Sequence, residues 1–321
     1  MDRRTFLAGP RAVLLAAPLA ASAQQAAKVF RVGALGVGAP ELLRQSLREV
    51  RYVEGQNLAV EWRDAEGKPE RFGDLAAELV RLKVDVIVAG NPAATFAAKK
   101  ATASIPIVMV NTPDPVQLGL VVSLGRPGGN ITGTTTLSAD LSSKQLEFLK
   151  EAVPQAGRIA VLWNRSNPWH SFALKGVETG ARSLAVQLQI LEVHGAGEFD
   201  GAFAAMTSKR AGAILILADP LFFFHRARLA DLAAKRGLPA ISGGSKGFVD
   251  AGGLMYYWAN QADLYQRVAS YVDRIHKGAK PRDLPIEQPT RFELVINLKT
   301  AKALGLTIPP SLLGRADEVI Q

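Results

Sequence analysis

Short polar side chains recur in this chain directly after runs of hydrophobic, β-branched residues. Asn91 and Asp219 each follow such a run and precede a proline, the usual arrangement of a helix N-cap with proline in the first turn. The ends of other hydrophobic runs hold a further set of polar residues: Asn111, Asp114, Asn164, Asn167 and Ser242. Such groups either bind a small polar ligand or do no more than cap the following helix.

The same turns suggest how a charged ligand would be held. Free N–H groups at the start of a helix attract anions, so the backbone of Ala93 and Ala94 predicts a carboxylate subsite. An ammonium group needs acceptors instead, which the carboxylates of Asp114 and Asp219 would supply. Tyr256 belongs to a group of aromatic residues on which a flat ligand could stack, although most aromatic side chains are core. The other members of that group are Trp163, Trp169, Phe222, Phe223, Phe224, Tyr257 and Trp258.

Motifs of catalysis and cofactor binding are weak or missing in the sequence. Gly33, Gly36 and Gly38 have the reverse of the glycine spacing of dinucleotide-binding loops, and there is no P-loop, nucleophile elbow or HExxH motif. The four histidines fall in separate predicted elements, and the lack of cysteine excludes disulfides and thiol catalysis. We therefore expect a binding protein without catalytic residues, metal or cofactor.

The elements that position these turns alternate between short hydrophobic runs and amphipathic stretches. Strands are predicted over Phe30–Leu35, Asn57–Trp62, Val84–Ala89, Ile105–Asn111, Asn130–Thr135, Arg158–Asn164, Val186–Val193, Ala213–Ala218, Pro239–Ser242, Leu254–Tyr257 and Phe292–Asn297. Helices are predicted over Glu70–Leu82, Leu141–Ala152, Ser171–Leu184, Phe199–Arg210 and Leu221–Arg236, and Lys277–Thr290 is expected to be an extended linker. This alternation predicts an α/β fold of parallel sheets with helices on both faces.

Two segments share one pattern of strand, Asx-Pro, helix, x-Pro and strand. The first starts at Val84 and the second at Ala213. One sheet of the ten strands that precede Lys277 is possible, but the repeat favours two doubly wound parallel-sheet lobes joined by hinge strands, with the ligand between them. We expect the N-terminal lobe to comprise 28–137 and 258–290, and the C-terminal lobe 138–257 and 291–321.

The first 23 residues predict an export signal. Arg3 and Arg4 precede Phe6-Leu7, as in twin-arginine signals, and a hydrophobic run ends in the small residues Ala21-Ser22-Ala23. That run is shorter than the ~20 residues that span a bilayer. A mature periplasmic chain would begin near Gln24, by either the twin-arginine or the general route. The formal net charge is +9, but the basic residues are scattered in pairs, which indicates solvated helix faces rather than nucleic-acid binding.

Several segments make the chain recognisable. It resembles the ABC-transporter substrate-binding protein family whose better-known members bind tryptophan or phenylalanine. The segments that carry the resemblance are Tyr52–Asn57, Leu75–Val80, Arg126–Asn130, Phe292–Ala301, Leu304–Leu306 and Ile308–Pro310. The resemblance implies a type I periplasmic-binding fold and partnership with an inner-membrane ABC permease and ATPase. It also implies that Asn91-Pro92-Ala93, Asp114, Asn164, Asn167 and Asp219 lie in cleft turns.

Three departures from the family pattern leave the ligand open. The loop after Leu35 is shorter than usual, Arg51 stands where glycine is common, and Leu254–Trp258 replaces a commoner Leu-Met-Ser-Tyr-Gly. We expect a monomeric receptor for an amino acid or another small carboxylate, aromatic ones included. The alternatives are a ligand-sensing module of a signalling receptor and an exported α/β enzyme.

Overall fold

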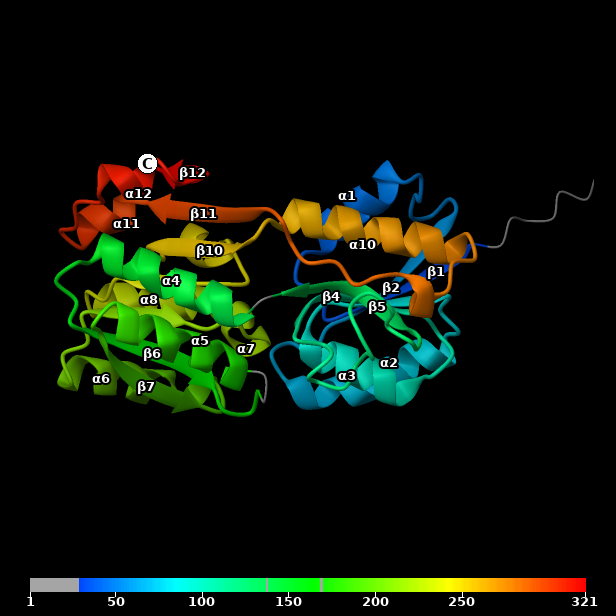
Figure 1. Ribbon diagram of the computed structural model, residues 1–321, viewed down its shortest axis with the longest axis horizontal. Coiled ribbons are helices and arrows are strands. Elements are labelled where there is room, and N and C mark those ends of the chain that lie inside the picture. Colours follow the sequence, from blue (N-terminus) through cyan, green and yellow to red (C-terminus); the bar gives the residue numbers. More distant parts are fainter. Residues whose placement is uncertain (1–28, 137, 168–169) are drawn as a thin grey trace, which may run out of the picture.

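The computed structural model describes residues 29–136, 138–167 and 170–321, which form two α/β lobes side by side (Figure 1). Each lobe is built around its own sheet, with five strands in the first and seven in the second. The predicted α/β class with two lobes is confirmed. The predicted export signal lies outside the described residues, as does Trp169. None of the described helices is both long and hydrophobic enough to cross a membrane.

The sheet of the first lobe is entirely parallel and is buried on both faces. Across it run β2 (Leu58–Arg63), β1 (Phe30–Leu35), β3 (Val86–Ala89), β4 (Ile107–Pro113) and β5 (Ile131–Thr136). One face packs against α1 (Pro40–Glu49) and α10 (Gln261–His276), the other against α2 (Phe72–Arg81) and α3 (Pro92–Ala101); a 3-10 turn, Pro69–Arg71, precedes α2. In β3, Val86 and Val88 point to the first face and Ile87 to the second, which explains the continuous hydrophobic run.

The sheet of the second lobe is parallel except at one antiparallel pair. Its order is β12 (Glu318–Ile320), β11 (Phe292–Asn297), β10 (Met255–Ala259), β9 (Ala240–Ser242), β8 (Ala213–Ile216), β6 (Arg158–Asn164) and β7 (Gln187–Val193), and β11 runs antiparallel to β10. One face carries α4 (Ser138–Ala152), α5 (His170–Ser183), α11 (Leu298–Ala303) and α12 (Pro310–Leu313). The other carries α6 (Phe199–Ser208), α7 (Pro220–Phe224), α8 (Arg226–Lys235) and α9 (Gly247–Asp250), with a 3-10 turn, Ala196–Glu198, before α6.

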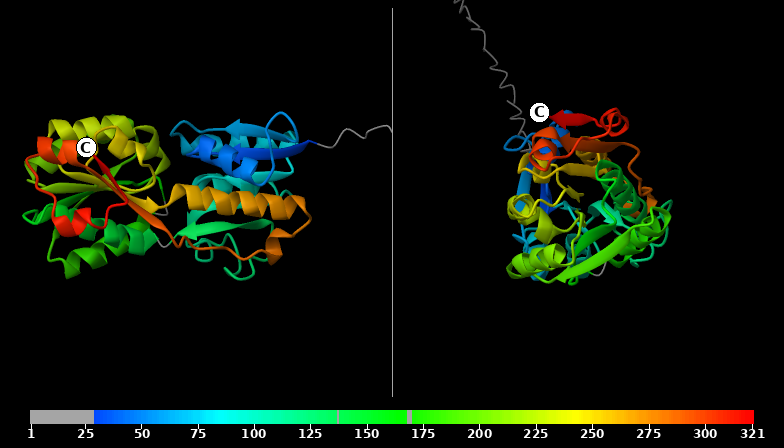
Figure 2. Two further views of the ribbon diagram at one scale, coloured as in Figure 1. Left: turned by 90° about the horizontal axis from the view of Figure 1, so that it is seen from above. Right: turned by 90° about the vertical axis from the view of Figure 1, so that its left-hand side faces the viewer.

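The chain passes between the lobes three times. It leaves the first lobe between β5 and α4, and returns between β10 and α10, which lies along the first lobe (Figure 2). After a 3-10 turn at Pro281–Asp283, the third passage leads into β11. Before crossing, it pairs with β5: the Thr135 N–H donates to the Glu287 carbonyl (2.9 Å), and the Glu287 N–H to the Gly133 carbonyl (3.0 Å). Three passages form a multi-stranded hinge.

Several predicted elements differ from those observed. The predicted single helix Leu221–Arg236 is wrong, because the segment forms two helices, α7 and α8, that meet at His225. The His225 N–H bonds to the Leu221 carbonyl in the last turn of α7, and the His225 carbonyl accepts from the Leu229 N–H in the first turn of α8. The segment Lys277–Thr290 is not extended throughout, since it contains the turn Pro281–Asp283. The prediction also missed α10 and β12, and it did not anticipate the antiparallel strand.

Candidate ligand-binding site

A cavity of about 550 Å³ lies between the two lobes, at the carboxyl ends of the strands of both sheets. Its size falls within the ~300–1,000 Å³ of small-molecule sites. From the first lobe it is lined by residues that include Gly36, Gly38, Lys68, Phe72, Asn91 and Asn111. From the second lobe it is lined by residues that include Asn167, His170, Asp219, Phe222, Ser242 and Trp258. A molecule in this cavity would touch both lobes at once.

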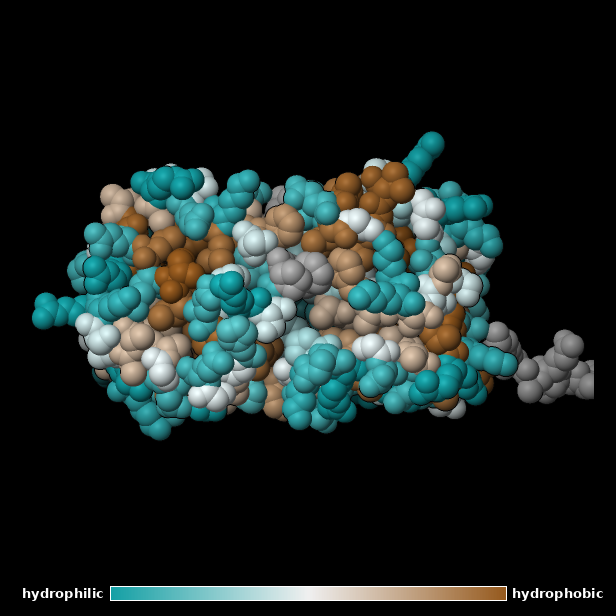
Figure 3. All heavy atoms as spheres, turned by 90° about the horizontal axis from the view of Figure 1, so that it is seen from below, coloured by the Kyte–Doolittle hydropathy of each residue, from teal (hydrophilic) through white to brown (hydrophobic). Residues whose placement is uncertain are grey.

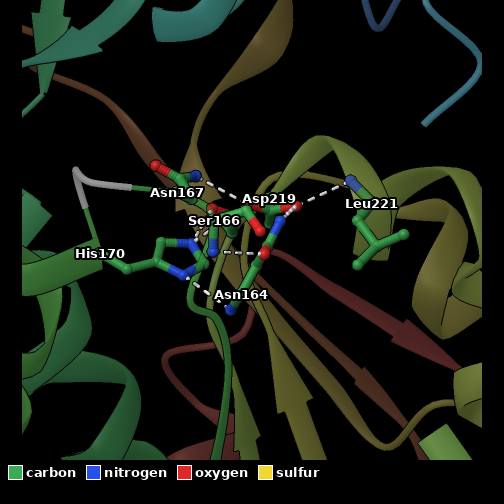
Figure 4. A network of polar contacts seen from close by, with 7 residues as sticks. Asn164, Ser166, Asn167, His170, Asp219 and Leu221 are labelled. Atoms are coloured by element: carbon green, nitrogen blue, oxygen red, sulfur yellow. Dashed lines mark hydrogen bonds and ion pairs between the residues drawn. The ribbon is translucent and has the colours of Figure 1, made fainter. Parts of the chain in front are cut away.

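Asp219 is the centre of a polar network on the second-lobe side (Figure 4). Its Oδ1 accepts hydrogen bonds from the Leu221 N–H (2.8 Å) and from Asn164 Nδ2 (3.2 Å). Its Oδ2 accepts one from Asn167 Nδ2 (2.6 Å). The bond to Leu221 caps α7, so Asp219 fixes both the polar turn after β6 and the short helix after β8.

His170 supports this network as a neutral ring. Its Nδ1 accepts a hydrogen bond from the Asn164 N–H (3.0 Å), so Nδ1 carries no proton. Its Nε2 lies 3.1 Å from the Ala218 carbonyl oxygen, to which only an N–H can donate. The Nε2-protonated tautomer therefore fits both contacts, and Nε2 lies 3.5 Å from Asp219 Oδ2.

The charge of Asp219 is consequently not balanced by a cation of the protein. The residue is 7% exposed, and its hydrogen-bond donors are two amides and a backbone N–H. Within the part of the chain that the structure describes, no lysine or arginine forms an ion pair with it. A carboxylate offers about four acceptor positions, so the three bonds leave Asp219 one, although its side chain is only 1% exposed; its charge favours a cationic donor there.

Asn91 performs two structural tasks at the edge of the first sheet. Its Oδ1 caps α3 by accepting from the Ala94 N–H (2.9 Å), and its Nδ2 donates to the Gly36 carbonyl (3.2 Å). Ala94 is fully buried, and neither Ala93 nor Ala94 lines the cavity. This turn therefore does not offer a ligand the free Ala94 N–H that the sequence suggested.

Asn111 lines the cavity and has an unpaired side-chain acceptor. The register of β4 against β5 shifts between Met109 and Thr112, and Asn111 has a left-handed backbone (φ +54°) within that bulge. Its N–H donates to Thr134 Oγ1 (2.9 Å), whereas its Oδ1 is buried without a hydrogen-bond partner. A buried acceptor left unpaired costs about 1–3 kcal/mol, so this position carries a local cost in stability.

The other predicted site residues are distributed as follows. Ser242 lines the cavity and donates to the Gly243 carbonyl (3.2 Å), whereas Asn164 is buried behind the network and does not line the cavity. Asp114, also with a left-handed backbone, lies outside the lining; burial and the nearby Asp140 carboxylate raise its pKa. Tyr256 is fully buried in the core, and burial raises its pKa.

Some lining residues were not predicted as site residues. His170, Lys68, Phe72, Arg226, Tyr265 and Glu293 belong to this group. The position of His170 in the first turn of the helix after β6 was the available signal. Tyr265 gives none, because α10 reaches the cavity only through the return of the chain to the first lobe.

The lobes also touch across the cavity mouth through α7. A Cβ placed on Gly38 would lie 3.6 Å from Phe223 Cε2, and one on Gly67 would lie 3.3 Å from Phe224 Cβ. Arg226 contacts Phe223 in two ways. Its Nη1 donates a hydrogen bond to the Phe223 carbonyl (3.0 Å), and its guanidinium Cζ lies 5.1 Å from the centroid of the Phe223 ring. Two adjacent phenylalanines of the second lobe thus pack against glycines of the first lobe. Because these contacts cross the cleft, the lobes are in a closed arrangement.

The family profile described as ABC transporter substrate binding protein matches residues 41–320. The chain belongs to this family. A relative, the tyrosine-binding protein of Clostridioides difficile (strain R20291), is 27% identical over 263 residues, which cover 82% of this chain and 75% of the relative.

Solved structures of similar proteins agree with this membership. The chain is similar to a conserved domain protein from Vibrio cholerae (TM-score 0.84, 25% identity, 91% of this chain and 100% of the other). It is also similar to a Streptococcus pneumonia domain in complex with L-Trp (TM-score 0.83, 25% identity, 91% and 99% coverage). This ABC transporter substrate binding protein therefore has the two-lobed type I periplasmic-binding-like fold.

Proposed function

We propose that this protein is the solute-binding component of an ABC importer and that it binds an amino acid between its lobes. The observation that carries the proposal is the buried carboxylate of Asp219, a residue of the cavity lining: among the described residues its hydrogen-bond donors are two amides and a backbone N–H, all neutral. An α-ammonium group would supply the missing charge and a further hydrogen bond. Residues of both lobes line the same cavity, Asn111 on the first and Asp219 on the second, so a ligand that contacts both would favour the closed form.

The rest of the lining favours a side chain with apolar surface, aromatic ones included. Phe72, Phe222, Phe223, Trp258 and Tyr265 contribute rings to the cavity from both lobes. Rings of this kind bind flat apolar groups by offset or edge-on contacts. The tyrosine-binding relative and the L-Trp complex support the same class of ligand.

The wider assignment follows from the family. We propose that an inner-membrane permease and an ATPase receive the ligand, and that residues 1–23 direct the chain to the periplasm. On the face shown in Figure 3, hydrophobic patches lie on both lobes among polar residues. A partner on such a face could contact both lobes and so respond to closure.

A ligand panel tests the proposal. Melting temperature and calorimetric affinity are measured with L-tyrosine, L-phenylalanine, L-tryptophan and L-leucine, and with 3-phenylpropionate, which lacks the ammonium group. We expect at least one amino acid to raise the melting temperature, since a ligand at 100 times its Kd stabilises by about 2.7 kcal/mol. We expect 3-phenylpropionate to bind at least tenfold more weakly than L-phenylalanine. Binding of none of the four amino acids would refute the proposed ligand class.

A further inference from the structure

Trp258 forms the wall of the cavity next to the hinge. It is the penultimate residue of β10, so the chain crosses to the first lobe directly after it. Its ladder partner on β11 is Glu293, which also lines the cavity. The backbone of Trp258 is thus fixed by pairing between two strands of the second sheet.

The indole ring of Trp258 packs directly against Gly243, the residue that follows β9. A Cβ placed on Gly243 would be 2.6 Å from Trp258 Cε3 and 2.9 Å from Cζ3, closer than real Cβ atoms approach other atoms. On its other side the same Cβ would meet Gln145 Nε2 at 2.5 Å, and that nitrogen is held by a 2.8 Å hydrogen bond to the Tyr257 carbonyl. The missing side chain therefore leaves room for the ring, and a side chain at Gly243 would displace the ring, Gln145 or both.

We propose that the Trp258–Gly243 pair determines which size of ligand side chain the cavity accepts. This inference rests on the proposed function, since it concerns the side chain of the bound amino acid. The close packing fixes the position of the ring, so the pair excludes ligand bulk at the hinge end of the cavity. Tight pockets discriminate about 10–200-fold for small changes in ligand size, so changes at either residue should shift the order of affinities.

Calorimetric Kd values for L-leucine and L-tryptophan test the proposal. Trp258→Ala removes the wall, and we expect the ratio of the L-tryptophan Kd to the L-leucine Kd to fall about tenfold. Gly243→Ala pushes the ring into the cavity, and we expect the same ratio to rise about tenfold. In the double variant the added methyl group meets no ring, so Gly243→Ala should change the ratio much less than in the wild-type background.

Controls separate selectivity from folding and from the proposed function. Trp62→Phe changes a tryptophan outside the cavity lining and should leave the ratio unchanged. Melting curves identify unfolded variants, and Trp258→Leu replaces Trp258→Ala if the latter does not fold. If the wild-type protein binds neither the two amino acids nor any other amino acid, the proposed function fails and this inference with it. If the wild-type protein binds them and both variants keep its ratio, this inference alone is overturned.

Discussion

At the scale of single residues, the decisive feature is a carboxylate whose environment is polar but neutral. Asn164 and Asn167 orient Asp219, and the neutral ring of His170 orients Asn164 in turn. Amide donors stabilise the ionised carboxylate without cancelling its field. The site is therefore prepared for a cation before any ligand arrives.

Asp219→Asn removes the negative charge of the side chain and keeps an oxygen that can cap α7. The asparagine oxygen can still accept from the Leu221 N–H, and asparagine is as good an N-cap as aspartate, so α7 should persist. The new amide nitrogen cannot accept from Asn167 Nδ2, so the side chain of Asn167 must turn away. We expect amino-acid affinity to fall by about 2–5 kcal/mol, the usual loss when one member of a buried charge pair is removed. Calorimetry measures the loss, and Asp200→Asn, an exposed position outside the cavity lining, is the control. Unchanged affinity in Asp219→Asn would mean that Asp219 acts only as a cap.

At the scale of elements, α7 connects the proposed ligand-binding residue Asp219 to the contacts between the two lobes. Asp219 caps this short helix at its start, and Phe223 and Phe224 at its end lie on Gly38 and Gly67 of the other lobe. A contact at Asp219 is thus connected to the cavity mouth through less than two turns of helix. The glycines supply the room that the two rings need.

Gly38→Val should hinder closure without harming either lobe. The Cγ atoms of valine would extend beyond a Cβ that already stands 3.6 Å from Phe223, and that contact exists only across the cleft. We expect ligand affinity to fall about tenfold or more, because the closed form becomes less populated. Small-angle scattering should show a smaller ligand-induced contraction, while the melting temperature without ligand stays near the wild-type value.

Gly129→Val is the matched control for this experiment. Nothing lies within 4 Å of a Cβ at Gly129, and it does not have a left-handed backbone. This variant should bind ligand and contract as the wild-type protein does. Equal behaviour of the two variants would show that Phe223 does not control closure.

The sequence allowed much of this arrangement to be predicted, because hydrophobic runs define strands and polar residues that follow neighbouring strands meet at one edge. Asn164 and Asp219 were expected near one cleft for that reason, and they share a hydrogen bond. The role of His170 depends on contacts with Asn164 and Ala218 that exist only in the folded chain. Likewise, only the end point of β10 decides that Trp258 reaches the cavity and Tyr256 does not.

At the scale of the whole molecule, the third passage between the lobes brings a carboxylate to the hinge. Glu293 of β11 follows the third passage and lies partly buried in the cavity lining. Burial raises its pKa, and the neighbouring carboxylates Glu318 and Asp317 raise it further. The hinge strand therefore carries a carboxylate that the folded protein keeps protonated to higher pH than the unfolded chain does.

The pH dependence of folding stability should reveal this group. Between the ordinary glutamate pKa of 4.5 and the raised pKa of Glu293, the folded state binds more protons than the unfolded state, so the stabilising contribution of that proton is lost as pH rises. Glu293→Gln removes the pH-dependent contribution of this carboxyl group to folding stability. We expect its melting temperature, relative to wild type, to increase from pH 4 to pH 7. Glu178→Gln, at an exposed position in α5, should show no such trend.

The packing of α10 against the first lobe also constrains how the protein is made. Tyr265, Val268 and Val272 complete the core over β1, β3 and β4, although they are synthesised more than 120 residues after β5 ends. In a growing chain α1 alone covers this face of the first sheet until α10 has been made. The first lobe therefore completes its core only after the chain has passed through β6 to β10 of the second lobe.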